Sequence, residues 1–447
     1  MNENPAHSQS GPKTPRPTSV WLVWLLRIVV GAVFVFSGIS KAFDPWGFIF
    51  KIEEYLGAWG IDLPRTVILV GAIALSVYEF VFGLMLAVGS LRRSAPWFLL
   101  ASMAVMLPLT GYIAFFGGVE DCGCFGDALK ISNTATFIKN IVLTAMLVWL
   151  CRCSGRLRRG IYAPEVQWIV GVLATVYILI ISLFGYNIQP LVDFRDYPAG
   201  TDLAAMTEET ADDFGDYLYR YERDGATRDF AADELPDSTW TFVDRVTPVD
   251  TSLDTSKFTI FEGDDDVTSW VIEPEGDQLL LIIPEPARAD ISYSYYANEF
   301  NSYINDRGGS MAALIGGGQK AIERWTDLSM ADYPGYTVDD TSLKEIARGV
   351  MSLVWLRDGK ILWKRTLSSI DYDTLQRVSD RTIEPDELAI NSRGILLTLT
   401  LIFGALLLVI ALFQQAIMSL IAFIRKKSQK NNVTLHSTKS HNDQSKT

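Results

Sequence analysis

Six long apolar runs dominate the sequence and leave few choices for its fold. Each is long enough, or nearly so, to cross about 30 Å of hydrocarbon as a helix of about 20 residues. A helix satisfies its own backbone hydrogen bonds, which the interior of a membrane requires. The sequence therefore predicts a mainly α-helical membrane protein with six spans, near Val20–Phe43, Val67–Val88, Ala95–Phe116, Ala135–Leu150, Val166–Phe184 and Ile395–Ile424.

The net charge of −13 is distributed unevenly between two parts of the chain. From Asp193 to Glu387 the chain carries 41 acidic and 18 basic residues, whereas the rest is basic. This division predicts a soluble acidic domain between the fifth and sixth spans. The polar tails, residues 1–19 and 425–447, are expected to be disordered.

Basic clusters indicate the orientation of the spans. Arg92 and Arg93 follow the second span, four arginines at 152–159 follow the fourth, and 425–427 follows the sixth. If the spans alternate, all three clusters and both termini lie on one side, which the positive-inside rule makes cytoplasmic. The first run has no signal-peptide cleavage site, so we expect an uncleaved helix. The acidic domain and the stretch EDCGCFGDALK at 120–130 then lie outside.

Missing residue types exclude several chemistries. The three histidines, His7, His436 and His441, all lie in the tails. We therefore expect no imidazole base, haem ligand or histidine-containing zinc site in the body of the protein. The stretch GGGQKA lacks the spacing of a phosphate-binding loop. A nucleic-acid partner is not expected.

Cys122 and Cys124 form the most reactive pattern in the chain. A bend at Gly123 could bring them within the 4.4–6.8 Å that a disulfide requires, but only in a small, strained and easily reduced ring. This suits an exchanging disulfide better than a structural one. Two alternatives stay open: a soft cation held by the thiolates with Asp121 and Asp127, and a turn that only shapes the loop.

Several charges lie within or beside the spans. Arg27 and Glu79 are at matching depths from the cytoplasmic side, which predicts an intramembrane ion pair, either structural or with a proton or ligand role. Lys41 and Lys139 are level with the two outer cysteines. They would lower the thiol pKa, opposed by Asp121 and Asp127, or alternatively reach to the membrane interface.

Cys151 and Cys153 lie at the inner end of the fourth span. They are too far from Cys124 to bridge to it. We expect reduced thiols that either pack at the interface or act as a relay.

Three stretches together resemble the DoxX/MauE family of bacterial membrane proteins: LRIVVGAVFVFSGISKAFDP at 26–45, YEFVFGLMLAVG at 78–89, and DCGCFGDALKISNTATFIKNIVL at 121–143. The resemblance covers roughly 20–155 and implies a four-helix bundle in the bacterial inner membrane. Its family-typical positions are Arg27, Lys41, Glu79, Cys122 and Cys124. It also implies membrane redox work, because MauE is linked to disulfide formation in a periplasmic partner and DoxD-type relatives to a thiosulfate:quinone oxidoreductase. The chain resembles the subset with a fifth helix, a periplasmic domain and a terminal helix.

The outer domain has two parts. The stretch YLYRYERDGATRDF predicts a hairpin within a β-rich segment, 190–257. The order of strands and helices over 258–380, ending in a hairpin at Asp358–Gly359, resembles the α/β thioredoxin fold. However, PEPARADIS has no cysteine where thioredoxins carry theirs, and RGVMSL has no proline before the hairpin. We therefore expect a degenerate domain that binds or positions a partner.

These patterns predict a redox accessory protein, embedded in the lipid bilayer, in which Cys122 and Cys124 exchange electrons with a periplasmic thiol protein, with a quinone as the possible membrane acceptor. Whether the chain is itself an enzyme stays open. The alternatives are a non-enzymatic assembly scaffold and a small-molecule transporter that uses Glu79. The expected divisions are 1–19, 20–155, 166–186, 190–257, 258–380, 394–424 and 425–447.

Overall fold

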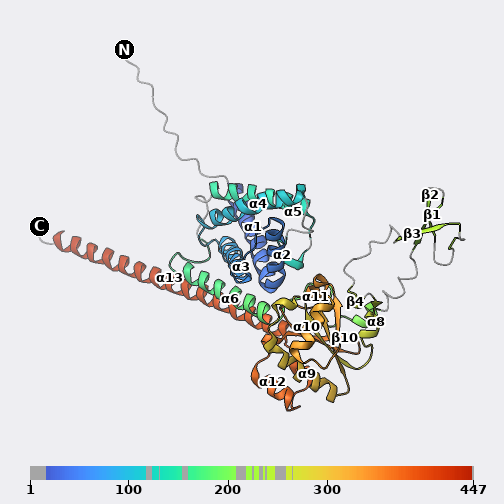
Figure 1. Ribbon diagram of the computed structural model, residues 1–447. Coiled ribbons are helices and arrows are strands. Elements are labelled where there is room, and N and C mark those ends of the chain that lie inside the picture. The colour runs from blue at the N-terminus through green and yellow to red at the C-terminus, as the bar shows by residue number, and fades with distance from the viewer. Residues whose placement is uncertain are drawn as a thin grey trace. The chain divides into compact units, whose positions relative to one another are not determined.

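The computed structural model divides the chain into two compact units, one formed by Met1–Ser182 with Arg393–Thr447 and the other by Leu183–Ser392. The ribbon of both units is drawn in Figure 1. The residues described are 17–116, 123–129, 131–153, 160–207, 218–223, 226–230, 235–236, 239–246, 258–263 and 265–444.

The first unit is helical. In the described part of the chain, six helices are long and apolar enough to cross a membrane, as predicted. Their lipid-facing positions carry exposed apolar side chains such as Val70, Val105 and Phe413, which suits contact with a bilayer. The helices are α1 (Pro17–Phe43), α3 (Arg65–Val88), α4 (Ala95–Phe116), α5 (Asn133–Cys153), α6 (Gln167–Asn187) and α13 (Ser392–Gln444).

Small residues bring α1 and α3 into close contact. A Cβ atom added to Gly31 would lie 2.8 Å from the backbone nitrogen of Ala87, and one added to Gly83 would lie 2.8 Å from Cβ of Phe34. Glycines at such crossings let two helix backbones approach, which favours helix association in lipid. Their positions therefore set the antiparallel register of α1 against α3.

The short helix α2 (Pro45–Ala58) was missed by the sequence analysis. Asp44 begins it, because its side chain accepts a hydrogen bond from the backbone N–H of Gly47 at 3.0 Å, and Pro45 occupies the first helical position. Trp46 and Ile49 are buried on one face, while Lys51 lies on the other. Asp44 thus ends one helix and starts the next.

Helices α6 and α13 lie side by side in the first unit. The ring of Tyr177 stacks on that of Phe403 with centroids 4.4 Å apart, and its hydroxyl lies 2.9 Å from Oγ1 of Thr400. Nearer the other end, the side chain of Gln414 accepts a hydrogen bond from the backbone N–H of Ala163 at 2.8 Å. The two helices that flank the second unit in the sequence are therefore joined by direct contacts.

A seven-stranded mixed sheet forms the core of the second unit (Figure 1), with strand order β10-β9-β6-β7-β8-β4-β5. β6, β7 and β8 are parallel, while β9 is antiparallel to β6 and to β10. The strands are β4 (Ile260–Glu262), β5 (Asp265–Asp266), β6 (Asp277–Ile283), β7 (Ser310–Ile315), β8 (Gly335–Val338), β9 (Ser352–Arg357) and β10 (Lys360–Thr366).

Side chains alternate across this sheet into two cores. Leu279 and Leu281 of β6 face one apolar cluster, while Leu280 and Ile282 face the other. Helices contribute to both clusters, so the central strand is buried on both faces. The helices are α8 (Thr268–Val271), α9 (Ser294–Asp306), α10 (Gln319–Ser329), α11 (Asp340–Ile346) and α12 (Tyr372–Ser379).

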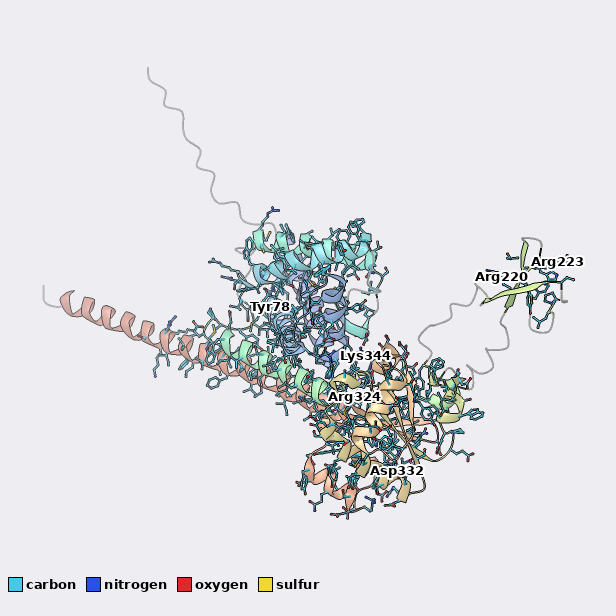
Figure 2. All side chains as sticks on the ribbon, in the orientation of Figure 1. Tyr78, Arg220, Arg223, Arg324, Asp332 and Lys344 are labelled. Atoms are coloured by element: carbon cyan, nitrogen blue, oxygen red, sulfur yellow. The ribbon has the colours of Figure 1, made fainter. Side chains whose placement is uncertain are left out.

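Both predicted hairpins are present. β1 (Leu218–Arg223) pairs with β2 (Ala226–Phe230) as expected, and β3 (Thr241–Val246) adds a third strand. Arg220 and Arg223 lie on β1 (Figure 2). The second hairpin joins β9 to β10 through Asp358 and Gly359, which both have positive φ values, as the right-handed twist of a two-residue hairpin favours.

Candidate functional site

A buried ion pair occupies the interior of the helical unit. Nζ of Lys41 on α1 lies 2.7 Å from Oε2 of Glu79 on α3, and the two side chains are 0% and 3% exposed. Lys41 also donates to Oγ of Ser37 at 2.6 Å and to the carbonyl oxygen of Cys124 at 2.7 Å. The three N–H groups of the ammonium therefore have three acceptors, which is the full complement of donors that a lysine carries.

Ser37 completes this cluster. Its Oγ lies 2.8 Å from Oε2 of Glu79 and 2.7 Å from the carbonyl oxygen of Cys124, so its single hydrogen can serve either acceptor. Ser37 and Lys41 are four residues apart and thus share one face of α1. Between them, Gly38 lets that face approach α3, because an added Cβ would lie 2.5 Å from the backbone nitrogen of Phe80.

The stretch 122–124, here called the CGC turn, is attached to the helical unit through Cys124. Gly123 has a φ of +61°, which provides the expected bend, and the backbone N–H of Gly126 donates to the carbonyl of Gly123 at 3.1 Å. The side chain of Cys124 is 8% exposed and packs with Ile113. The helical unit therefore holds both the main chain and the side chain of Cys124.

Two of the predicted site residues, Asp121 and Cys122, lie outside the described residues, so the separation of the two thiols stays a prediction. Asp127 lies half-buried in the first turn of a short 3₁₀ helix, Gly126–Ala128.

Lys139 on α5 contacts Phe125, the residue that follows Cys124. Its Nζ is 4.0 Å from the centre of the Phe125 ring, a cation–π contact. A cavity of about 20 Å³, the space of about one water molecule, is lined by Lys139, Glu79 and Cys124 among others. Ser37, Glu79, Lys139 and Cys124 thus line one small cavity, and Lys41 pairs with Glu79 beside it.

The predicted pair of Arg27 with Glu79 is wrong. Arg27 lies beside the end of α3, where its Nη2 is 3.4 Å from the carbonyl oxygen of Ala87, eight residues beyond Glu79. Eight residues of helix span about 12 Å. Counting inward from the ends of the apolar runs misjudged the register, which the glycine contacts between α1 and α3 set instead.

Sequence reasoning also missed Ser37. Its spacing of four residues from Lys41 was a usable signal, because a polar residue one turn from a buried lysine faces the same neighbour. Lys41 itself is buried, so the alternative in which its side chain reaches to the membrane interface is wrong.

The inner cysteines, Cys151 and Cys153, end α5. Cys153 is buried in an apolar cluster with Leu147, Leu150 and Tyr162. This surrounding favours the packing role over a relay.

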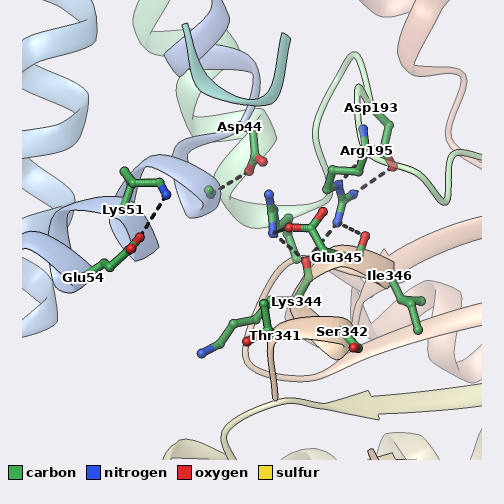
Figure 3. Close-up of polar contacts among 12 residues, drawn as sticks. Asp44, Lys51, Glu54, Asp193, Arg195, Thr341, Ser342, Lys344, Glu345 and Ile346 are labelled. Carbon is green, nitrogen blue, oxygen red and sulfur yellow. Dashed lines mark hydrogen bonds and ion pairs between the residues drawn. The ribbon is translucent and has the colours of Figure 1, made fainter. Parts of the chain in front are cut away.

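The second unit holds its own buried charge cluster. The carboxylate of Asp193 receives hydrogen bonds from Nε and Nη2 of Arg195, at 2.7 and 2.8 Å, and from Nζ of Lys364 at 2.5 Å (Figure 3 shows Asp193 with Arg195). Burial by itself would raise the pKa of Asp193, but the charges and hydrogen bonds of Arg195 and Lys364 outweigh it and lower the pKa to about 2. Arg195 and Lys364 also donate to main-chain carbonyls, at Glu345 and Ile346 respectively. This cluster ties the segment after α6 to the sheet.

By contrast, the ion pair between Lys51 and Glu54 on α2 (Figure 3) is partly exposed, with Nζ 2.9 Å from Oε2. Its two side chains are 20% and 41% exposed, so it should contribute little to stability.

Comparisons with known protein families match two parts of the chain, one of which lies in the helical unit. Residues 19–153 match the family described as methylamine utilisation protein MauE, and residues 216–251 match a domain of unknown function. The chain is also 24% identical over 135 residues to protein TlpB of Flavobacterium psychrophilum. That match covers 30% of this chain and 37% of the relative, so the chain spans well under two thirds of it. No solved structure is significantly similar to the chain.

Proposed function

We propose that this protein is a membrane redox accessory in which Cys122 and Cys124 exchange electrons with a periplasmic thiol protein. The observation that carries the proposal is the buried cluster of Ser37, Lys41 and Glu79, which binds the carbonyl oxygen of Cys124. A buried, hydrogen-bonded polar network favours one geometry, here that of the backbone that carries the thiol of Cys124. The match of residues 19–153 to the MauE family covers every member of this cluster.

The proposed exchange balances as two electrons. A thiolate of the partner dithiol attacks the Cys122–Cys124 disulfide, which yields a mixed disulfide and one released thiolate. The second thiol of the partner then displaces that linkage, leaving the partner oxidised and both cysteines reduced. A membrane quinone would reoxidise them by accepting two electrons and two protons. Strain in the small ring favours the first step.

The same proposal sets the topology. Both termini and the arginine clusters face the cytoplasm of a bacterium, and the acidic second unit faces the periplasm. Arg92 and Arg93 follow α3, and Arg152 lies in the last turn of α5, which supports this orientation.

We propose a docking role for the second unit, as a degenerate thioredoxin-like domain. Its strand order β7-β6-β9-β10, with β6 and β7 parallel and β9 and β10 antiparallel, supports the resemblance. The segment between Asp193 and Glu387 contains no cysteine, so it cannot itself exchange thiols. It would bind the partner protein.

Thiol trapping in intact cells tests the redox proposal. Free thiols are blocked at the moment of lysis and the remaining cysteines are mass-tagged, in wild type and in the Cys122→Ser and Cys124→Ser variants. We expect a mixture of oxidised and reduced wild type, and a trapped mixed disulfide in one single variant. Cys153→Ser, on the buried end of α5, is the matched control and should behave as wild type.

Permanent reduction of both outer cysteines, or full function of the double serine variant, would refute the redox role and favour the scaffold. The transporter alternative is less well supported, because Glu79 already pairs with Lys41 and its cavity of about 20 Å³ holds about one water molecule. Uptake lost in Glu79→Gln but unchanged in the cysteine variants would favour it.

A further inference from the structure

Arg27 is a buried cation whose guanidinium lacks most of its hydrogen bonds. The residue is 0% exposed, and among the described residues its Nε and Nη1 have no partner. Nη2 reaches the carbonyl oxygen of Ala87 at a long 3.4 Å, and Cζ lies 4.7 Å from the centre of the Trp24 ring. An arginine is always charged, and a buried charge without a counter-ion is strongly unfavourable. The surroundings of Arg27 are therefore incomplete.

The turn after α3 covers this guanidinium. Gly89 has a φ of +76°, and a Cβ atom added there would lie 2.6 Å from both Nη1 and Nη2 of Arg27. A larger side chain here would press on the guanidinium and would require a strained backbone, because φ is positive. The next residue, Ser90, is also 0% exposed, and its Oγ has no hydrogen-bond partner in the described part of the chain. The unpartnered nitrogens of Arg27 and the unpartnered hydroxyl of Ser90 thus both lie at the turn after α3.

A cavity of about 380 Å³ opens on the same turn. Gly89 forms part of its wall, and the guanidinium of Arg27 packs against the same glycine. Arg92 and Arg93 add two positive charges to the wall, and none of the described residues that line it is acidic. The remaining lining residues are Leu91, Ser94, Gly160, Tyr162, Pro164 and Gln167.

We propose that this cavity binds a phosphate group, as a monoester or diester, with Arg27 as its buried counter-charge. A phosphate offers several acceptor oxygens at once, which suits a wall with two arginines above a third cation. The volume is about ten times the share of one liquid water molecule, which admits a phosphate with part of its substituent. The position of the turn at the end of a membrane-spanning helix is where lipid headgroups lie, but a free phosphate would meet the same donors.

The test uses full-length protein, delipidated in neutral detergent, and two probes. Binding of inorganic phosphate is measured by calorimetry. Binding of phosphatidylglycerol is measured by native mass spectrometry after titration, with phosphatidylcholine as the uncharged reference. The variants are Arg27→Met and Arg93→Gln. Arg65→Gln is the matched control, because Arg65 already pairs with Glu53 at 2.7 Å.

We expect wild type to bind at least one probe, and Arg27→Met to weaken that binding by about tenfold, because a buried positive charge beside the site is lost. Arg93→Gln should weaken it less, and Arg65→Gln should leave it unchanged. Response to inorganic phosphate identifies a soluble phosphate as a sufficient ligand, whereas response to phosphatidylglycerol alone identifies a lipid headgroup.

Thermal unfolding separates binding from misfolding. The effective probe should raise the melting temperature of wild type but not that of Arg27→Met. Failure of wild type to bind either probe, or equal affinity in wild type and Arg27→Met, would overturn the proposal. If Arg27→Met does not fold, Arg93→Gln decides: an unchanged affinity in that variant also overturns it.

Discussion

Replacing Lys41 with methionine would remove the ammonium from the buried cluster and leave the carboxylate of Glu79 without its cation. Both side chains are almost completely buried, at 0% and 3% exposure, so water cannot replace the lost partner. Removing one member of such a pair destabilises a protein by about 3 to 5 kcal/mol. We expect a loss of this size for Lys41→Met, and a similar loss for Glu79→Leu.

The double variant is the sharper measurement. With both charges gone, Ser37 can still donate to the carbonyl oxygen of Cys124 at 2.7 Å, so that acceptor keeps a partner. Replacing a whole buried pair with apolar groups is often neutral or stabilising. Lys41→Met with Glu79→Leu should therefore recover most of the stability, with a coupling energy of several kcal/mol in the cycle.

The free energy of unfolding would be measured by titrating the purified protein from mild detergent into SDS. Lys51→Met is the control, because its partly exposed pair with Glu54 should contribute less than about 1 kcal/mol. Both proteins would then be compared in a Cys122→Ser background after reduction. Alkylation of Cys124 should be faster with Lys41→Met than without it, because the carbonyl oxygen of Cys124 loses its hydrogen bond from Lys41. A loss below about 1 kcal/mol for Lys41→Met, or strictly additive single losses, would refute the reasoning.

Three further outcomes can be checked on the full-length protein. The pKa of Asp193 is lowered from 3.8 to about 2, so its ionised form contributes about 2 kcal/mol to the free energy of unfolding. This contribution should be present above pH 4 and be lost as the pH falls toward 2. An Asp193→Asn variant should therefore show a flatter acid-unfolding profile over that range. Gly83→Leu should lower the unfolding free energy in the SDS titration by at least about 1 to 3 kcal/mol, because its side chain would meet Phe34, whereas Gly71→Leu on the same helix has open space and should be silent. Asp44→Ala should cost about 1 kcal/mol by removing the cap of α2, and equal stability of this variant and wild type would show that the cap is dispensable.

Hydropathy predicted the spans because membrane insertion depends on local composition. A run such as 67–88 is apolar whatever its neighbours are, so α3 follows from its own residues. The same holds for β6, whose residues Leu279–Ile283 are apolar at every position because both faces of the sheet are covered. Each of these elements carries its own signal.

The partner of Glu79 could not be predicted in this way. Lys41 and Arg27 are both cations on α1, and the choice between them depends on how far α1 slides along α3. That register is set by close contacts at Gly31, Gly38 and Gly83, a property of two segments together. Helix α2 was not predicted for a related reason. Its apolar face covers only part of a short stretch, and the composition of that stretch is typical of neither a span nor a loop.

The contacts between α6 and α13 have a mechanical consequence. The second unit, from Leu183 to Ser392, is attached at both ends to these two helices, which are joined by the stacked rings of Tyr177 and Phe403. The helix pair closes a loop of roughly 200 residues, much as a covalent cross-link would. In the chain-entropy treatment, such a closure lowers the conformational entropy of the unfolded unit by an amount equivalent to about 5 kcal/mol of free energy. A force that pulls on this unit would therefore act on a closed loop of polypeptide, which cannot be extended from one end until α6 and α13 separate.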